Sequence, residues 1–137
     1  DGGGPSLVLI RPATRPDPNI AAHWRSSAFS GGSPGNADAI PYGGGDPIAH
    51  AIVGSPRVIL AGDGTLLYSY TRRASAESVR LTVEWSENLV TWETADRAGA
   101  TSVADFEAGT VREFLPFPLG NRRFARLKAT VIPGHQP

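Results

Sequence analysis

The sequence predicts an all-β protein built as an antiparallel β-sandwich, and three features of the chain carry that prediction. Residues 66–92 alternate aliphatic and aromatic residues between turn-forming residues, the pattern of a β-hairpin followed by the start of a third strand. Further short segments rich in β-forming residues recur at roughly regular spacing, as they do in sandwiches. No segment keeps a helical period. We therefore expect an immunoglobulin-like β-sandwich of about seven or eight strands, preceded by a long irregular N-terminal segment.

The expected strands of the sandwich are separated by turns and loops. Residues 62–64, Gly-Asp-Gly, form a tight turn of the Asp-Gly kind. Residues 79–85 alternate strictly, so their two valines, Leu81 and Trp85 are expected to share one face. We expect strands at 57–61, 66–73, 79–85, 90–94, 110–115 and 123–132.

One further strand is expected near the N-terminus. Residues 6–10, SLVLI, are rich in β-forming residues and lie close to Pro12, which cannot donate to a ladder. From Pro12 to Pro56 the prolines and glycines leave no periodic pattern, so we expect the first strand to be isolated from the others. We interpret this region as an extended connector that lies on a partner surface, with Trp24 and Phe29 as its anchors.

Such a long irregular segment is unusual inside a compact domain. It either has a function, packs as a belt, or marks a boundary between modules. We therefore divide the chain into an N-terminal strand with its Pro/Gly-rich connector, residues 1–56, and a β-sandwich domain, residues 57–137.

Composition argues against several classes of function. The 13 basic and 13 acidic residues balance, without the basic stripe that phosphate backbones require, so nucleic acid is not an expected partner. The chain has no cysteine, which excludes disulfides, thiolate metal sites and cysteine nucleophiles. It also has no apolar run long enough to span a bilayer.

The N-terminus suggests a processed protein. The chain contains no methionine and begins at Asp1. We expect a mature or excised product whose export signal and upstream sequence have been removed, which places the protein outside the cell or on its surface. An engineered chain with a cleaved tag is the competing explanation.

No motif in the sequence specifies catalysis. Residues 31–35 match the Gly-x-Ser-x-Gly pattern of a hydrolase nucleophile elbow, but the elbow uses the backbone N–H of the residue after serine, and Pro34 has none. The histidines at 23, 50 and 135 are far apart and none belongs to a paired metal motif. We expect a turn at 31–35, and neither enzyme activity nor a cofactor nor a metal.

The second half of the chain resembles a known module. The segments YSYTRR, VRLTVEWSENLVTW and RRFARLKATV are similar to the C-terminal β-rich module found repeatedly on large exported proteins of Verrucomicrobia and related bacteria. The resemblance covers residues 66–131, and the turn from Ser86 to Trp92 is its most specific part. That module is regarded as non-catalytic.

A second resemblance covers residues 6–38. SLVLIRP followed by HWRSSAFSGGSPGNAD is similar to the end of a bacterial lamin-tail domain, also regarded as non-catalytic. In related proteins an aspartate-rich calcium segment often separates the two modules. Residues 36–41 retain Asp38 as their one carboxylate, whereas calcium takes about six to eight oxygen ligands. The resemblance therefore does not extend to a calcium site.

Two functions follow as expectations. The first is a non-catalytic, exported structural or surface-attachment module whose partners are other copies of itself or cell-surface components. In its sharper form the N-terminal strand, through Leu7, Val8, Leu9 and Ile10, adds to a sheet edge of a neighbouring copy. A contact of that kind does not close on itself, so it builds a filament.

The alternative is a carbohydrate-binding module. Its candidate stacking residues are Tyr68, Tyr70, Trp85 and Trp92, which would have to be exposed to contact sugar rings. The competing interpretation places these aromatic side chains in the core between the sheets, where large aromatic residues commonly pack.

Overall fold

The computed structural model describes residues 3–34, 38–40, 42–95, 100, 102–117 and 124–133. These residues contain nine strands in antiparallel sheets and one short α-helix, which confirms the all-β class. In chain order the elements are β1 (Pro5–Leu9), the 3₁₀ turns η1 (Pro12–Thr14) and η2 (Ala21–His23), β2 (Trp24–Ser30), α1 (Pro47–Ala51), β3 (Ile52–Leu60), β4 (Leu66–Arg73), β5 (Val79–Ser86), β6 (Glu93–Thr94), β7 (Val103–Glu107), β8 (Thr110–Phe117) and β9 (Phe124–Val131).

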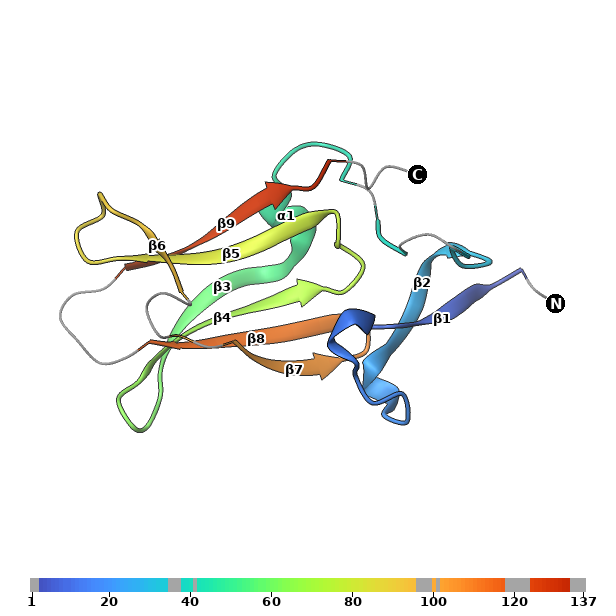
Figure 1. The fold of residues 1–137 in the computed structure, drawn as a ribbon, viewed down its shortest axis with the longest axis horizontal. Coiled ribbons are helices and arrows are strands. Elements are labelled where there is room, and N and C mark those ends of the chain that lie inside the picture. The colour runs from blue at the N-terminus through green and yellow to red at the C-terminus, as the bar shows by residue number, and fades with distance from the viewer. Residues whose placement is uncertain are drawn as a thin grey trace.

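Two sheets face each other and enclose the main core (Figure 1). One has four strands in the order β3-β4-β8-β7, and the other has three in the order β6-β5-β9. Tyr68, Leu115 and Phe117 of the first sheet pack with Val83 and Leu127 of the second. The arrangement is sandwich-like, as the alternating pattern predicted.

The strands with the clearest alternation lie where the sequence places them. β4 has the predicted bounds, and β5 extends the predicted strand by one residue. Within β5, Val79 and Val83 are buried, while Leu81 and Trp85 pack against the core from partly buried positions. Burial of alternate apolar side chains on one face therefore fixes the register of this strand. Arg123 and His135, which belong to the sequence predictions, lie outside the described residues.

The prediction of an isolated first strand was wrong. β1 pairs antiparallel with β2, a strand inside the segment expected to be irregular, and the two form a separate two-stranded sheet. β2 was missed because its alternation is inverted: the buried positions are held by Arg25 and Ser27, whereas Phe29 is exposed. Trp24 lies in the same strand, and its Nε1 donates to the carbonyl of Pro18 at 2.8 Å.

Other parts of the predicted connector are also regular. α1 begins at Pro47 and is capped by Asp46, whose carboxylate accepts from the backbone N–H of Ile48 at 2.9 Å. A capping aspartate followed by proline is a favoured helix start. β3 then begins at Ile52, before the domain boundary drawn at residue 56.

The C-terminal strands show two further differences. β8 continues through Pro116, beyond the expected end at residue 115. This is possible because the pairing of β8 with β7 reaches only to Phe114. Beyond that residue β8 has a neighbouring strand, β4, on one side only. β7 itself was not predicted, because it is short and most of its residues are exposed.

The turn from Ser86 to Trp92 is held by its own polar side chains. Ser86 Oγ accepts from the backbone N–H of Leu89 at 2.8 Å, and Asn88 Oδ1 accepts from that of Thr91 at 2.8 Å. The guanidinium of Arg126 lies 4.0 Å from the ring centre of Trp92. Serine, asparagine and tryptophan thus have a structural role in this turn.

Candidate functional site

The outer edge of β1 is open. Ile10 N donates to His23 O at 2.7 Å, so the backbone groups of Ile10 and Val8 face β2. Because successive residues of a strand direct these groups to opposite edges, those of Leu7 and Leu9 face away from β2. No strand in the described part of the chain pairs with that edge, and Leu7 is 73% exposed.

The free edge of β2, by contrast, is capped. Ala28 N donates to both carboxylate oxygens of Asp38, at 2.9 and 3.2 Å. Ser26 O accepts from Arg25 Nη1 at 2.9 Å, and Arg25 forms an ion pair with Asp38. Both charged side chains are nearly fully buried. The pair occupies backbone groups that an incoming strand would need, which blocks strand addition at this edge.

The surroundings of Asp38 favour its ionised form. Burial alone would raise its pKa, but hydrogen bonds from Ala28 N, Arg25 and Ser33 Oγ outweigh burial, so the pKa lies below its ordinary value. These donors satisfy both carboxylate oxygens, so Asp38 has a structural role at this edge of the hairpin.

This depressed pKa predicts a pH dependence of stability. The contribution is fully present above the unfolded-state pKa of about 3.9 and is lost as the pH falls through the lower folded-state pKa. Below about pH 4, we expect the free energy of unfolding of the wild type to decrease relative to that of the Asp38→Asn variant, which lacks this titration. Urea unfolding of both proteins between pH 2 and pH 6, values chosen to span the roughly pH 4 transition, measures the difference. A constant difference over that range would contradict the prediction.

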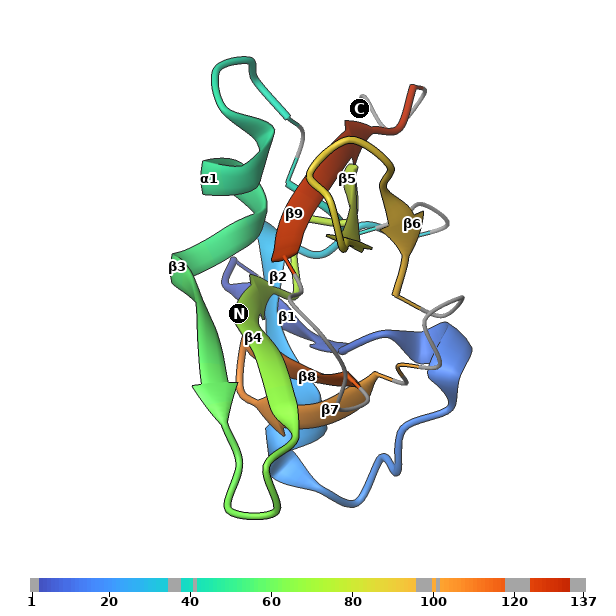
Figure 2. The ribbon, with the colours of Figure 1, turned by 90° about the vertical axis from the view of Figure 1, so that its left-hand side faces the viewer.

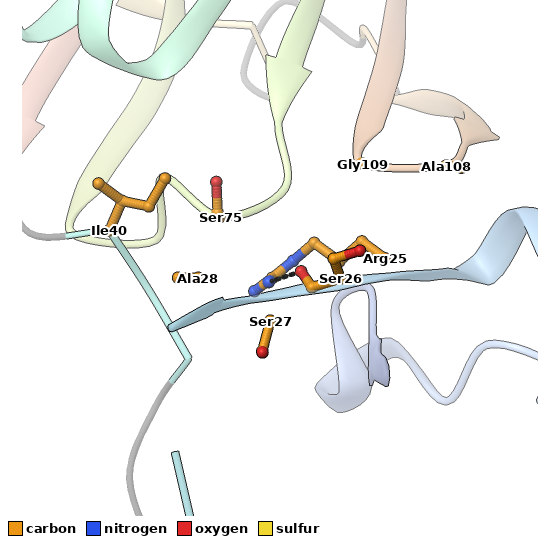
Figure 3. Close-up of a pocket in the computed structure, with 8 residues that line it drawn as sticks. All are labelled: Arg25, Ser26, Ser27, Ala28, Ile40, Ser75, Ala108 and Gly109. Carbon is orange, nitrogen blue, oxygen red and sulfur yellow. Dashed lines mark hydrogen bonds between the residues drawn. The ribbon is translucent and has the colours of Figure 1, made fainter. Parts of the chain in front are cut away.

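A groove of about 420 Å³ separates β2 from one end of the sandwich (Figure 3). β2 contributes residues 25–28, and the opposite wall comes from Ile40, from Ser75 between β4 and β5, and from Ala108 and Gly109 between β7 and β8. Figure 3 shows the Arg25 side chain lying along the strand toward the carbonyl of Ser26. Among the described residues of this lining, Arg25 is the only ionisable one and is paired with Asp38, so they provide no acid–base pair.

A second ion pair, between the partly exposed Arg11 and the buried Glu113, ties the N-terminal hairpin, β1 with β2, to the sandwich. Arg11, which follows β1, binds one carboxylate oxygen of Glu113 on β8, and the Tyr70 hydroxyl donates to the other. Glu113 is 5% exposed. Burial, reinforced by the charge of Glu113, raises the pKa of Tyr70 well above its usual range. The three side chains form one network that holds Arg11 in place.

The four residues expected to contact another copy differ in exposure. Leu7 is exposed, Val8 and Leu9 are partly buried, and Ile10 is 1% exposed. Ile10 packs on Ala74 and Val111 at the end of the sandwich and is not available to a partner, which corrects that part of the expectation.

The four aromatic residues do not share one exposed face. Tyr68 and Tyr70 are buried in the core, which contradicts their proposed role in stacking on glycans. Trp85 packs against the same core, and Trp92 is covered by Arg126. Core packing, the competing interpretation, accounts for both tyrosines.

The sequence did not reveal the two ion pairs that hold the hairpin. Their members are ordinary charged residues in the sequence, and the pairs Arg25–Asp38 and Arg11–Glu113 join residues 13 and 102 positions apart. Arg25 and Ser27 occupy alternate positions of β2 and are both buried. The sequence would have predicted this strand only if polar residues had been allowed on its buried face.

No protein-family model, no curated protein and no solved structure matches this chain. No helix in the described residues is long and apolar enough to cross a membrane.

Proposed function

We propose that the chain is a non-catalytic structural or surface-attachment module of an exported protein, and that it associates with other copies of itself through the open edge of β1. The observation that carries the proposal is the difference between the two edges of the hairpin. One edge is capped by a buried ion pair, while the other leaves the backbone groups of Leu7 and Leu9 unpaired by any strand of the described chain.

Edge strands are normally protected, because an unpaired edge is a template for another strand. Capping one edge at the cost of burying two charges, while leaving the other open, favours a specific contact at the open edge. In this contact β1 would remain paired with β2 of its own chain, and its outer edge would pair with a second copy. It would not detach from its own chain as a donated strand. Such a contact joins two different surfaces and builds an open filament.

The proposal includes a location outside the cell or on its surface and an immunoglobulin-like relationship of the sandwich. The resemblance of residues 66–131 to modules of exported bacterial proteins supports the location. The two facing antiparallel sheets support the immunoglobulin-like relationship. The carbohydrate-binding alternative has no comparable support, since the tyrosines that it needs are in the core.

Self-association is the direct test. We expect sedimentation velocity and electron microscopy to show species that grow with protein concentration, and Leu7→Lys to abolish them, since a lysine on an edge strand discourages pairing. Val103→Lys is the matched control, because Val103 is a 57% exposed valine on the edge strand β7. A wild type that stays monomeric at every concentration would overturn the proposal.

A further inference from the structure

The strand edges of the sandwich are protected unequally. β6 has only two residues, β7 carries Asp105 and Glu107, and β9 carries the exposed Arg126 and Lys128. Short length and charge are the usual protections of an edge. The first half of β3 has a register shift between Val53 and Arg57, within which Pro56 has no N–H to offer.

The last three residues of β3, which follow the charged Arg57, lack all of these protections. Residues 58–60, Val-Ile-Leu, are uncharged and 64%, 39% and 70% exposed. Ala61 N donates to Thr65 O at 2.8 Å, so the backbone groups of Ala61 and Ile59 face β4. Those of Val58 and Leu60 therefore face outward. This edge is the counterpart of β1: apolar, uncharged and open.

The exposure of Val58 and Leu60 follows from the layering. Val58 pairs with the buried Tyr68, so both side chains lie on the inner face of their sheet. α1 contacts β3 and β9, but beyond α1 the three-stranded sheet does not extend over the end of β3 (Figure 2). A shallow apolar pocket lined by Val58, Leu66 and Phe124 opens there.

We propose that this edge of β3, residues 58–60, is the acceptor for β1 of a second copy of the chain; the inference rests on the proposed self-association and names its other half. The two open edges lie toward opposite ends of the long axis (Figure 1). β1 and β3 also run in the same general direction along that axis. Copies stacked end to end along it, with a rotation that aligns the two strands, would therefore bring β1 of one copy parallel to β3 of the next.

The backbone groups fit the same arrangement. In the parallel register that places Leu7 level with Ile59, the outward groups of Leu7 meet those of Val58 and Leu60.

The test uses one variant for each half of the contact. Leu60→Pro removes an outward N–H that the β3–β4 ladder does not use, and Leu7→Lys blocks β1. Each variant alone is expected to remain monomeric at a concentration at which the wild type assembles. Mixed in equal amounts, they should form dimers and nothing larger, because the mixture holds one working donor and one working acceptor. Circular dichroism checks that each is folded, and Ile59→Lys replaces Leu60→Pro if the latter unfolds.

The outcomes separate this inference from the proposed function. If Leu60→Pro and Ile59→Lys both assemble as the wild type does while Leu7→Lys does not, β3 is not the acceptor and self-association through β1 stands. Symmetric dimers of folded Leu60→Pro alone would indicate β1 pairing with β1 and would also overturn this inference. If the wild type never assembles, both proposals fail.

Discussion

Replacing Asp38 with alanine is expected to lower the free energy of unfolding by about 3–5 kcal/mol, because it leaves the guanidinium of Arg25 buried without its partner. Arg25 and Asp38 are each almost fully buried, and the same carboxylate accepts from Ala28 N. Since small domains have only about 5–15 kcal/mol of stability, the loss is a large fraction of the total. Urea unfolding followed by tryptophan fluorescence measures it, with Trp24 located on the hairpin.

Two controls test the mechanism of this effect. Glu107→Ala breaks an exposed pair with Arg112 and is expected to cost less than about 1 kcal/mol. Replacing both members, as Arg25→Met with Asp38→Leu, should recover much of the stability, since a buried pair can often be exchanged for apolar side chains. A loss in Asp38→Ala no larger than in Glu107→Ala would show that the buried pair does not hold the hairpin.

Replacing Arg11 with alanine is the second large effect. The buried Glu113 carboxylate would keep only the Tyr70 hydroxyl as a hydrogen-bond partner, with the charge of Arg72 nearby, and we expect a loss of about 3 kcal/mol. Arg15→Ala is a matched control, because Arg15 ends the same 3₁₀ turn in the same left-handed conformation but is exposed. Its substitution should change stability by no more than about 0.5 kcal/mol.

Thermal and urea unfolding of the two arginine variants measure this difference directly. The double variant Arg11→Ala with Glu113→Gln should be more stable than Arg11→Ala alone, because glutamine removes the uncompensated charge. Equal losses in Arg11→Ala and Arg15→Ala would mean that the backbone conformation of the turn, rather than the ion pair with Glu113, fixes the hairpin.

The fold was predictable where burial follows apolar alternation. β4, β5, β8 and β9 carry apolar residues at most of the alternate positions that face the core, with Glu113 of β8 as an exception, and each strand lies within a few residues of its predicted place. β2 does not follow that rule, because its buried positions hold Arg25 and Ser27. A pattern method that expects apolar residues inside has no reason to find a strand there.

Of the candidate site, only the presence of the first strand was predictable from the sequence. The amino acids of residues 6–10 identify a strand, since β-branched and aliphatic residues favour a pleated surface. Whether that strand is isolated, paired or available to another copy depends on β2 and on the ion pairs of Arg25 and Arg11, which join residues far apart in sequence.

By itself, the sequence determined the all-β class and the positions of the most regular strands, because the alternation of apolar and polar side chains is a local property of the chain. Only the tertiary structure decided which strand edges are capped and which are open. That outcome depends on charges brought together across the fold and on how far one sheet extends over the other, and neither quantity is encoded in any local pattern.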